Sequence, residues 1–320
     1  MTRWTSDDIP PLTGRRAIVT GATSGLGYET ALELGRHGAH VTLAVRDRTR
    51  GEASRAALET ELAGAPGRGS FEVGDLDLAS LESIHAFADG IVAGGADLNL
   101  LVNNAGVMAI PRRETVDGFE TQLGTNHLGH MALTLRLLAL LARTGSAGPA
   151  ARVVTVSSNV HKTGRIDLDG LMGTRSYKPW TAYSQSKLAN LLFTYELQRR
   201  LDAAGLPVGA YAAHPGYSAT NLSSVGPAMT GSTVQQWTMR VSDRLLAQSA
   251  AMGALPTLYA ATVPGLAPAS YVGPSGFNEW RGHPTLVTPR DTALDESVAA
   301  ALWARSEELV GLRFDEVTAG

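Results

Sequence analysis

Short apolar runs alternate with longer amphipathic stretches along most of the chain. The apolar runs have the length of strands and little internal alternation, which is typical of strands buried on both faces of a sheet. They predict strands at 17–20, 41–45, 71–73, 98–102, 152–156, 208–213 and 270–272. The stretches between them repeat their apolar positions with the period of a helix. They predict helices near 25–37, 49–63, 80–93, 116–142, 181–203, 250–261 and 291–310.

Strands that alternate with helices of this length predict an α/β fold, with a parallel sheet covered by helices on both faces. No linker-like segment divides the chain, so we expect a single domain over residues 1–320. The region 217–250 has weak strand signals and mixed polarity. A long irregular segment in a compact domain is usually functional, and we therefore expect a substrate-binding loop or lid there.

The composition narrows the functional classes. The chain is 44% hydrophobic, and its net charge of −3 offers no basic surface for nucleic acid or anionic membranes. The absence of cysteine excludes disulfides, cysteine zinc sites and thiol nucleophiles, and it fits a reducing cytoplasm. We find neither the apolar core of a signal peptide nor the ~18 apolar residues of a membrane span. We therefore predict a cytoplasmic protein without a nucleic-acid or membrane partner.

A glycine-rich turn follows the first predicted strand. It reads Thr-Gly-Ala-Thr-Ser-Gly-Leu-Gly over 20–27 and leads directly into a predicted helix. Glycines let a backbone approach a pyrophosphate closely, while the helix N-terminus presents N–H donors and the positive end of its dipole. The spacing is Gly-x-x-x-Gly-x-Gly, and such a loop can also be a bare turn. Its place between a strand and a helix favours a dinucleotide site.

Tyr183 and Lys187 form a second candidate site. They are four residues apart, so on a helix they share one face. A phenol near pKa 10 needs a shift of about three units, about 4 kcal/mol, to exchange protons at neutral pH. An ammonium at about 4 Å favours the phenolate by roughly that much. The pair therefore predicts a tuned proton donor and acceptor, although the same spacing also occurs on ordinary helix surfaces.

Further blocks occur in a fixed order along the chain. They are Asn-Asn-Ala-Gly at 103–106, Asn126, Ser157-Ser158 and Pro215-Gly216. With the glycine turn and the tyrosine–lysine pair, these blocks resemble a short-chain dehydrogenase/reductase over residues 14–220. The segments 164–167, 183–190 and 214–216 are similar to the retinol-dehydrogenase-like group. The resemblance implies a single-domain Rossmann-like, doubly wound sheet of about seven strands in the order 3-2-1-4-5-6-7.

The resemblance also implies catalytic roles. Tyr183 would be the acid/base, and Lys187 would hold the ribose hydroxyls of the cofactor and lower the pKa of Tyr183. Ser158 would hydrogen-bond the substrate oxygen, with Ser157 as the alternative, because neighbouring strand residues point to opposite faces. Asn126 would interrupt its helix and hold a water in a proton relay with Lys187.

The choice of cofactor depends on the end of the second strand. An acidic residue there repels a 2′-phosphate, whereas an arginine accommodates it. The family's acidic position matches Val45, and Arg46 follows, which favours NADP(H) over NAD(H); Asp47 should point away. The other cofactor-binding residues that the resemblance implies, besides Tyr183 and Lys187, are Gly21, Thr23, Ser24, Gly25, Leu26, Gly27, Asp75, Leu76, Asn103, Ala105, Gly106, Pro215, Gly216 and Thr220.

These residues predict an NADP(H)-dependent oxidoreductase that interconverts a carbonyl and an alcohol on an apolar, fairly bulky small molecule. A retinal-type reductase and a ketoreductase for polycyclic natural products both remain open. The alternative is a catalytically silent cofactor sensor or scaffold on the same fold. Many members of the group carry an N-terminal membrane anchor, which this sequence does not predict.

No metal site is predicted, because His127 and His130 stand at helical i, i+3 spacing without an evident third ligand. Members of the family are often homodimers or homotetramers built through the helices near 116–142 and 181–203, and a monomer stays open for this chain.

Overall fold

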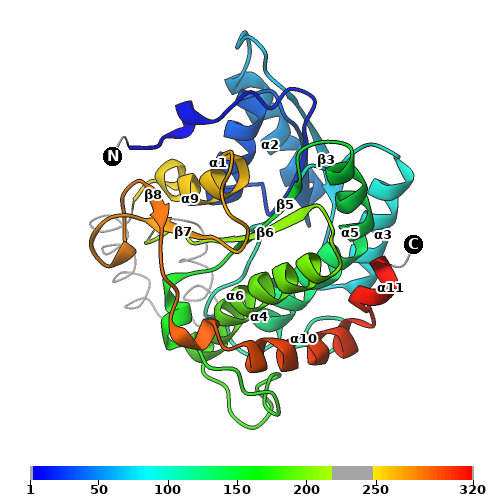
Figure 1. Ribbon diagram of the computed structural model, residues 1–320, viewed down its shortest axis with the longest axis vertical. Helices are drawn as coiled ribbons and strands as arrows, with labels where there is room; N and C mark the ends of the chain where they lie inside the picture. Colours follow the sequence, from blue (N-terminus) through cyan, green and yellow to red (C-terminus); the bar gives the residue numbers. More distant parts are fainter. Residues whose placement is uncertain (1–2, 218–247, 319–320) are drawn as a thin grey trace.

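A single sheet organises the part of the chain that the computed structural model describes, residues 3–217 and 248–318. Within it the sheet has eight strands in the order β3-β2-β1-β4-β5-β6-β7-β8 (Figure 1). The strands are β1 (Arg16–Thr20), β2 (His40–Val45), β3 (Ser70–Asp75), β4 (Leu100–Asn103), β5 (Ala151–Val156), β6 (Val208–Ala213), β7 (Tyr271–Pro274) and β8 (Pro284–Leu286). The predicted doubly wound order is confirmed from β3 to β7, and all of these strands are parallel.

The predicted number of strands is one too few. β8 pairs antiparallel with β7, with Val272 opposite Leu286. It is only three residues long and begins with Pro284, so it carries neither an apolar run nor a strand alternation. A proline that opens a short edge strand is tolerated because its missing N–H is not needed by a further neighbour.

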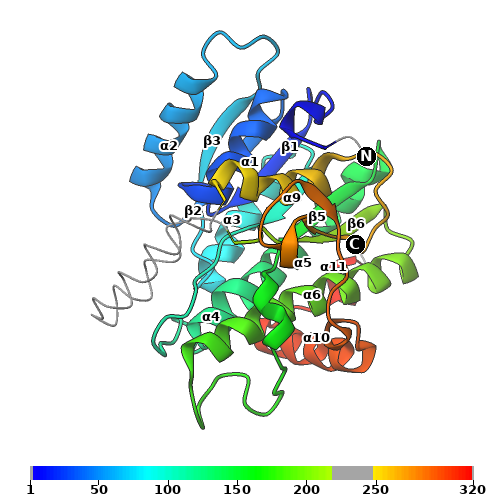
Figure 2. The same ribbon diagram turned by 90° about the vertical axis from the view of Figure 1, so that its left-hand side faces the viewer.

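Helices cover both faces of the sheet. α1 (Gly25–Arg36), α2 (Arg48–Glu61) and α9 (Ala250–Thr262) lie on one face, and their apolar side chains join one core cluster. The other cluster gathers α3 (Leu81–Ala93), α5 (Gly129–Ser146), α6 (Pro179–Ala203), α10 (Glu296–Val310) and α11 (Phe314–Thr318). α10 lies alongside α6 on the outer side of this second layer (Figures 1 and 2).

Two predicted helices are divided in the structure. The stretch 116–142 becomes α4 (Thr121–Leu123), a π-helical segment (Gly124–Leu128) and α5. α4 begins where the Glu120 carboxylate accepts the N–H groups of Gln122 and Leu123. The stretch 291–310 becomes a short 3-10 turn and then α10, because Asp295 caps a new helix by accepting from Ser297 and Val298.

The carboxyl ends of β1 and β4 are tied together at the switch point of the sheet. Thr20 Oγ1 accepts the backbone N–H groups of Asn104 and Ala105, both at 2.9 Å. In return Asn104 Nδ2 donates to the carbonyl of Thr20 at 2.8 Å. Thr20 is fully buried. In open α/β sheets ligands bind outside the carboxyl ends at such a point, so these bonds shape the base of a binding site.

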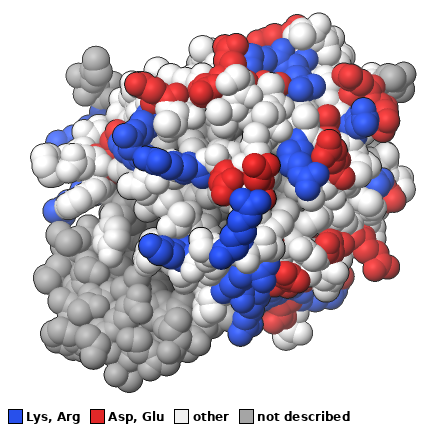
Figure 3. All heavy atoms as spheres, turned by 90° about the horizontal axis from the view of Figure 1, so that it is seen from below, with Lys and Arg blue, Asp and Glu red and all other residues white. Residues whose placement is uncertain are grey.

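The described surface of the protein shows no large patch of one charge in the view of Figure 3. On the face seen in Figure 3, acidic and basic side chains are interspersed. None of the helices in the described ranges combines the length and apolarity that a bilayer crossing needs. The predicted loop or lid at 217–250 lies almost entirely outside the described residues, as does Thr220. The cytoplasmic location stays a prediction.

Replacing Thr20 with valine should destabilise the fold at nearly constant volume. The backbone N–H groups of Asn104 and Ala105 would lose their acceptor in a partly buried place, and leaving such donors unpaired costs up to about 1–3 kcal/mol each. Urea denaturation should therefore show a free energy of unfolding lower by about 2 kcal/mol or more. The exposed Thr49→Val is the matched control. Equal stability of the two variants would contradict the role given to Thr20.

Candidate active site

Tyr183 faces Ser158 at the carboxyl end of β5. Tyr183 lies in the second turn of α6, which begins with Pro179, and its side chain is 6% exposed. The side chain of Ser158, the second residue after the strand, lies close enough to this hydroxyl to favour its ionised form. Ser157 points the other way, because its Oγ donates to the carbonyl of Lys187 at 2.7 Å. The structure therefore brings Ser158, not the alternative Ser157, to the tyrosine.

Lys187 lies one helical turn further along α6. Its ammonium donates to the carbonyl of Val156 at 3.0 Å and lies 5.8 Å from the centre of the Tyr183 ring. Its side chain is buried, yet within the described residues one hydrogen bond serves three N–H donors. Buried donors without acceptors are rare, so this ammonium fits a site that receives hydroxyl groups such as those of a ribose.

The predicted lowering of the pKa of Tyr183 is wrong for these residues by themselves. Burial raises the pKa of Tyr183 to about 12, and the neighbouring Ser158 side chain opposes this only in part. Burial also lowers the pKa of Lys187 to about 8, because its ammonium is desolvated. The prediction weighed the attraction between the two groups but not the cost of burying each of them.

Asn126 sits in the π-helical segment, which confirms the predicted interruption of the helix. Its Oδ1 accepts the N–H of Val107 at 2.8 Å, and its Nδ2 donates to the Val107 carbonyl and to Ser186 Oγ, both at 2.9 Å. The side chain thus ties the loop after β4 to α6. A water relay from Asn126 to Lys187 stays a prediction.

His130 is a further residue of this site that the sequence did not reveal. One ring nitrogen contacts Thr20 Oγ1 at 3.0 Å, and the other contacts the backbone carbonyl of Asn126 at 3.0 Å. A π-helical segment shifts the backbone pairing, which leaves carbonyls for side chains to use. His127 turns instead to Ser306, at 2.9 Å. The two histidines therefore serve different partners.

The glycine turn has the geometry that a phosphate site needs. Gly21 and Gly25 adopt left-handed φ angles of +69° and +57°. A Cβ on Gly27 would lie 2.5 Å from the carbonyl oxygen of Gly21, so only glycine allows this approach. Ser24 precedes α1 without a side-chain capping bond. The first N–H groups of α1 are therefore not capped by Ser24, as in helix termini that bind phosphate.

Arg46 stands free at the end of β2. It is exposed and makes no ion pair within the described residues. The Asp47 carboxylate accepts the N–H of Arg50 and so caps α2, which turns it away as predicted. Asp75 is exposed and pairs with Arg48 at 2.9 Å. The guanidinium of Arg46 is thus free to bind a phosphate at the end of β2, where the adenosine ribose of a cofactor would lie.

The other predicted cofactor residues lie along the same edge of the sheet. Asn103 is fully buried and donates to Thr134 at 3.0 Å, so its side chain turns inward. The Pro215 carbonyl accepts from Gln248 Nε2 at 2.7 Å. Of the remaining residues, Leu26 lies in the first turn of α1, and the turns after β1, β3, β4 and β6 hold Thr23, Leu76, Ala105, Gly106 and Gly216.

Comparison with known proteins agrees with this geometry. A family model described as short chain dehydrogenase matches residues 15–229. Polyprenol dehydrogenase of Mus musculus is 41% identical over 307 residues, which cover 95% of this chain and 86% of that protein. Retinol dehydrogenase 13 of Homo sapiens is 41% identical over 305 residues, covering 95% and 87%. The crystal structure of an uncharacterized protein from Mycobacterium Paratuberculosis has 47% identity and a TM-score of 0.77, covering 98% and 99%.

The fold and the site are those of an oxidoreductase that uses a nicotinamide cofactor. The family model matches more than half of the chain, and the relatives are aligned over nearly all of it. The protein therefore belongs to the short-chain dehydrogenase family, and within it to the retinol-dehydrogenase-like group.

The buried ammonium of Lys187 should make stability depend on pH. Its pKa is about 8 in the folded state against 10.5 ordinarily, so between these values the unfolded chain binds more protons and stability rises with pH. Lys187→Met should remove a rise of at most about 3 kcal/mol. The chain has only three lysines, Lys162, Lys178 and Lys187, which keeps the background low.

Urea denaturation of the protein without added cofactor from pH 7.5 to 10 checks this. Tyrosines with raised pKa values, such as Tyr183, act in the opposite sense as the pH nears 10, but the wild type and Lys187→Met carry the same tyrosines, so the difference between their slopes reports Lys187. Lys178→Met is the matched control, because Lys178 is exposed. The idea fails if the wild type and Lys187→Met have the same slope of stability against pH.

Proposed function

We propose that the protein is an NADP(H)-dependent oxidoreductase that interconverts a carbonyl and an alcohol on an apolar, fairly bulky substrate. The observation that carries this proposal is the convergence of Ser158, Tyr183 and Lys187 at the carboxyl end of β5, on the same edge of the sheet as the glycine turn. The three groups supply a hydrogen bond, a proton and a positive charge around one point. Reduction of a carbonyl needs all three on the oxygen side.

Tyr183 donates its hydroxyl proton to the substrate oxygen in reduction and takes it back in oxidation. Ser158, beside that hydroxyl, binds the substrate oxygen and stabilises the charge that develops there. When bound, the nicotinamide supplies or accepts the hydride, and its oxidised ring carries a positive charge. Lys187 holds ribose hydroxyls and brings a second cation near the phenol. Added positive charge acts against the rise in the pKa of Tyr183 that burial causes.

Arg46 supports the choice of NADP(H). Its guanidinium is exposed at the end of β2, and planar donors of this kind bind phosphate oxygens in pairs. Asp47, the nearest carboxylate in the chain, is occupied in capping α2. The apolar Val45 stands at the position where an acidic side chain would repel a 2′-phosphate, and Arg46 follows it.

Apolar side chains near Tyr183 support an apolar substrate. Trp180 packs edge-on against the Tyr183 ring at 6.0 Å between centres and remains 42% exposed. Met172 lies in the loop before α6 and reaches the N–H of Glu120 with its sulfur at 3.3 Å. The similar proteins are named for polyprenol and retinol, which are isoprenoid alcohols. We propose a substrate of this class, in preference to a polycyclic ketone.

Tyr183→Phe should lower turnover at least ~100-fold, the usual size of an acid–base contribution. The hydroxyl is lost while the ring and its contact with Trp180 remain, so cofactor binding should persist. Absorbance at 340 nm would follow NADPH and NADH oxidation with retinal, polyprenals, aliphatic aldehydes and polycyclic ketones. NADPH binding would be measured by fluorescence titration.

Near-normal turnover by Tyr183→Phe would exclude the assigned acid/base. If the wild type binds NADPH tightly but reduces no member of the panel, while Tyr183→Phe binds equally well, the result would instead support a cofactor sensor or scaffold. Tyr259, in α9, packs edge-on against Trp4 as Tyr183 does against Trp180, so Tyr259→Phe is the control for the loss of a phenol hydroxyl.

Arg46→Ala should weaken NADPH binding at least ~10-fold and leave NADH binding within about twofold, because a charge-assisted phosphate contact is lost. Dissociation constants for both cofactors, measured at one ionic strength, check this. Arg50→Ala removes a similar exposed charge from the start of α2 and is the matched control. An equal loss for NADPH and NADH would show that Arg46 does not bind the 2′-phosphate.

A further inference from the structure

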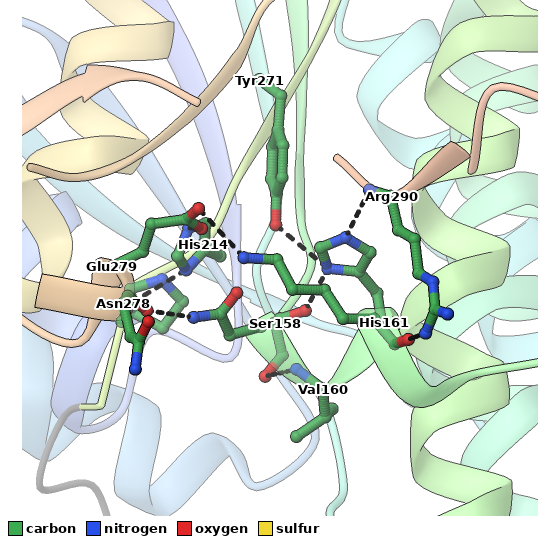
Figure 4. Close-up of polar contacts among 12 residues, drawn as sticks. Ser158, Val160, His161, His214, Tyr271, Asn278, Glu279 and Arg290 are labelled. Atoms are coloured by element: carbon green, nitrogen blue, oxygen red, sulfur yellow. Dashed lines mark hydrogen bonds and ion pairs between the residues drawn. The ribbon is translucent and has the colours of Figure 1, made fainter. Parts of the chain in front are cut away.

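Three segments that are far apart in sequence meet around the Glu279 carboxylate. Its Oε1 lies 3.0 Å from Lys162 Nζ, in the 3-10 turn Asn159–Thr163 that follows Ser158. Its Oε2 lies 3.0 Å from His214 Nε2, in the turn after β6 (Figure 4). Glu279 itself belongs to the loop between β7 and β8. One carboxylate thus bridges the turns that follow the two strands flanking the site.

The ring of His214 has a defined orientation and protonation. Its Nδ1 accepts the backbone N–H of Gly216 at 3.2 Å, so the proton must reside on Nε2, facing Glu279. Within the described residues neither Nε2 nor Oε2 has a hydrogen-bond partner of good geometry, so their 3.0 Å approach is a close polar contact between two buried atoms. His214 is fully buried, and a Cβ on Gly273 of β7 would lie 2.1 Å from its Nε2. The fold therefore reserves space for this imidazole.

The charges of the cluster are fixed near neutral pH. The contact with His214, helped by Lys162, lowers the pKa of Glu279 to about 2, so the carboxylate stays ionised. Burial lowers the pKa of His214, so the imidazole stays neutral. The carboxylate side chain is only 21% exposed. An ionised, mostly buried carboxylate that holds two partners is a firm bridge rather than a surface ion pair.

The backbone around Glu279 is held in an unfavourable form. Asn278 and Glu279 have φ angles of +50° and +58°, which residues with side chains seldom adopt. The Asn278 carbonyl accepts from Asn159 Nδ2 at 2.7 Å, which adds a second bond to the turn after β5. On the other side, the Trp280 carbonyl accepts the N–H of Tyr217 at 2.7 Å. Strained residues persist where surrounding contacts impose them, and they gather at functional sites.

The turn that carries Ser158 is also anchored from its far side. The N–H of Arg290 donates to His161 Nε2 at 3.4 Å, which leaves the proton on Nδ1. That Nδ1 then donates to the Ser158 carbonyl at 2.7 Å (Figure 4). Ser158 is therefore held between His161 on one side and the Glu279 bridge on the other.

We propose that Glu279, together with His214 and Lys162, forms a positioning cluster that sets the distance between Ser158 and the Pro215–Gly216 turn. Ser158 would hold the substrate oxygen and the Pro215–Gly216 turn would cover the nicotinamide. The cluster would thus align the carbonyl carbon of the substrate with the nicotinamide, between which the hydride is transferred. This inference rests on the proposed function. Small misplacements of reacting groups cost rate steeply, whereas they leave the remote half of a cofactor bound.

Glu279→Gln tests the proposal, because it keeps the shape and removes the charge. We expect turnover per bound NADPH to fall at least ~10-fold, while the dissociation constant of NADPH stays within about threefold. The deuterium isotope effect with NADPH labelled at the transferred position should rise, because misalignment makes hydride transfer more limiting. A merely structural role would lower thermal stability or the number of binding sites without changing the isotope effect.

Lys162 provides a second, independent variant, since it is 37% exposed and its loss should not prevent folding. Lys162→Met should reproduce the rise in the isotope effect, and Lys162→Arg should restore the wild-type value. Glu308→Gln, in the surface pair with Arg305, is the matched control. Wild-type turnover per site and isotope effect in both Glu279→Gln and Lys162→Met would overturn the proposal.

A readout without turnover separates this proposal from the proposed function. With NADPH bound, amide hydrogen exchange in peptides covering 157–163 and 214–217 should increase in Glu279→Gln and not in Glu308→Gln. Unchanged exchange in both peptides would overturn the cluster even if Tyr183→Phe is inactive. If the wild type reduces no carbonyl but exchange still increases in Glu279→Gln, the proposed function is contradicted, whereas the bridge between the two turns is supported.

Discussion

The carbonyl oxygen of Val156, the last residue of β5, accepts hydrogen bonds from both Lys187 and Asn190 at 3.0 Å. This one buried acceptor fixes successive turns of α6 against the sheet. Tyr183, one turn earlier on the same face, is thereby set against Ser158 just beyond the end of the strand. The position of α6 along β5 decides whether Tyr183 and Lys187 reach the end of the strand. The rest of the site depends on this one placement.

Much of the fold and part of the site followed from local patterns. Continuous apolar runs predicted β1 to β7, since a strand buried on both faces shows itself within a few residues. The turn at 20–27 was recognisable because glycines at close approaches leave a fixed spacing. The interruption of the helix at Asn126 was also predicted correctly, from the resemblance to the short-chain dehydrogenases.

What the sequence could not supply depends on burial and on distant partners. The direction of the pKa shift of Tyr183 was missed because desolvation is a property of the packed interior. β8 was missed because Pro284 opens a strand of three residues. Glu279 reads as one more charged residue in a loop, and only the structure brings it to His214 and Lys162. Lys162 and His214 are too far from Glu279 in the sequence for the spacing of a helix or a strand to predict these contacts.

The empty place at Gly273 has a consequence for how this sequence can change. Gly273 does not have a left-handed φ; what forbids a side chain there is the ring of His214. The His214 ring occupies the space that a side chain at position 273 would need. A smaller residue at 214 would therefore allow a side chain at 273, whereas histidine at 214 requires glycine there. Among relatives the pair should therefore covary. β7 thus influences the site through Gly273, because the missing side chain there leaves room for the ring of His214.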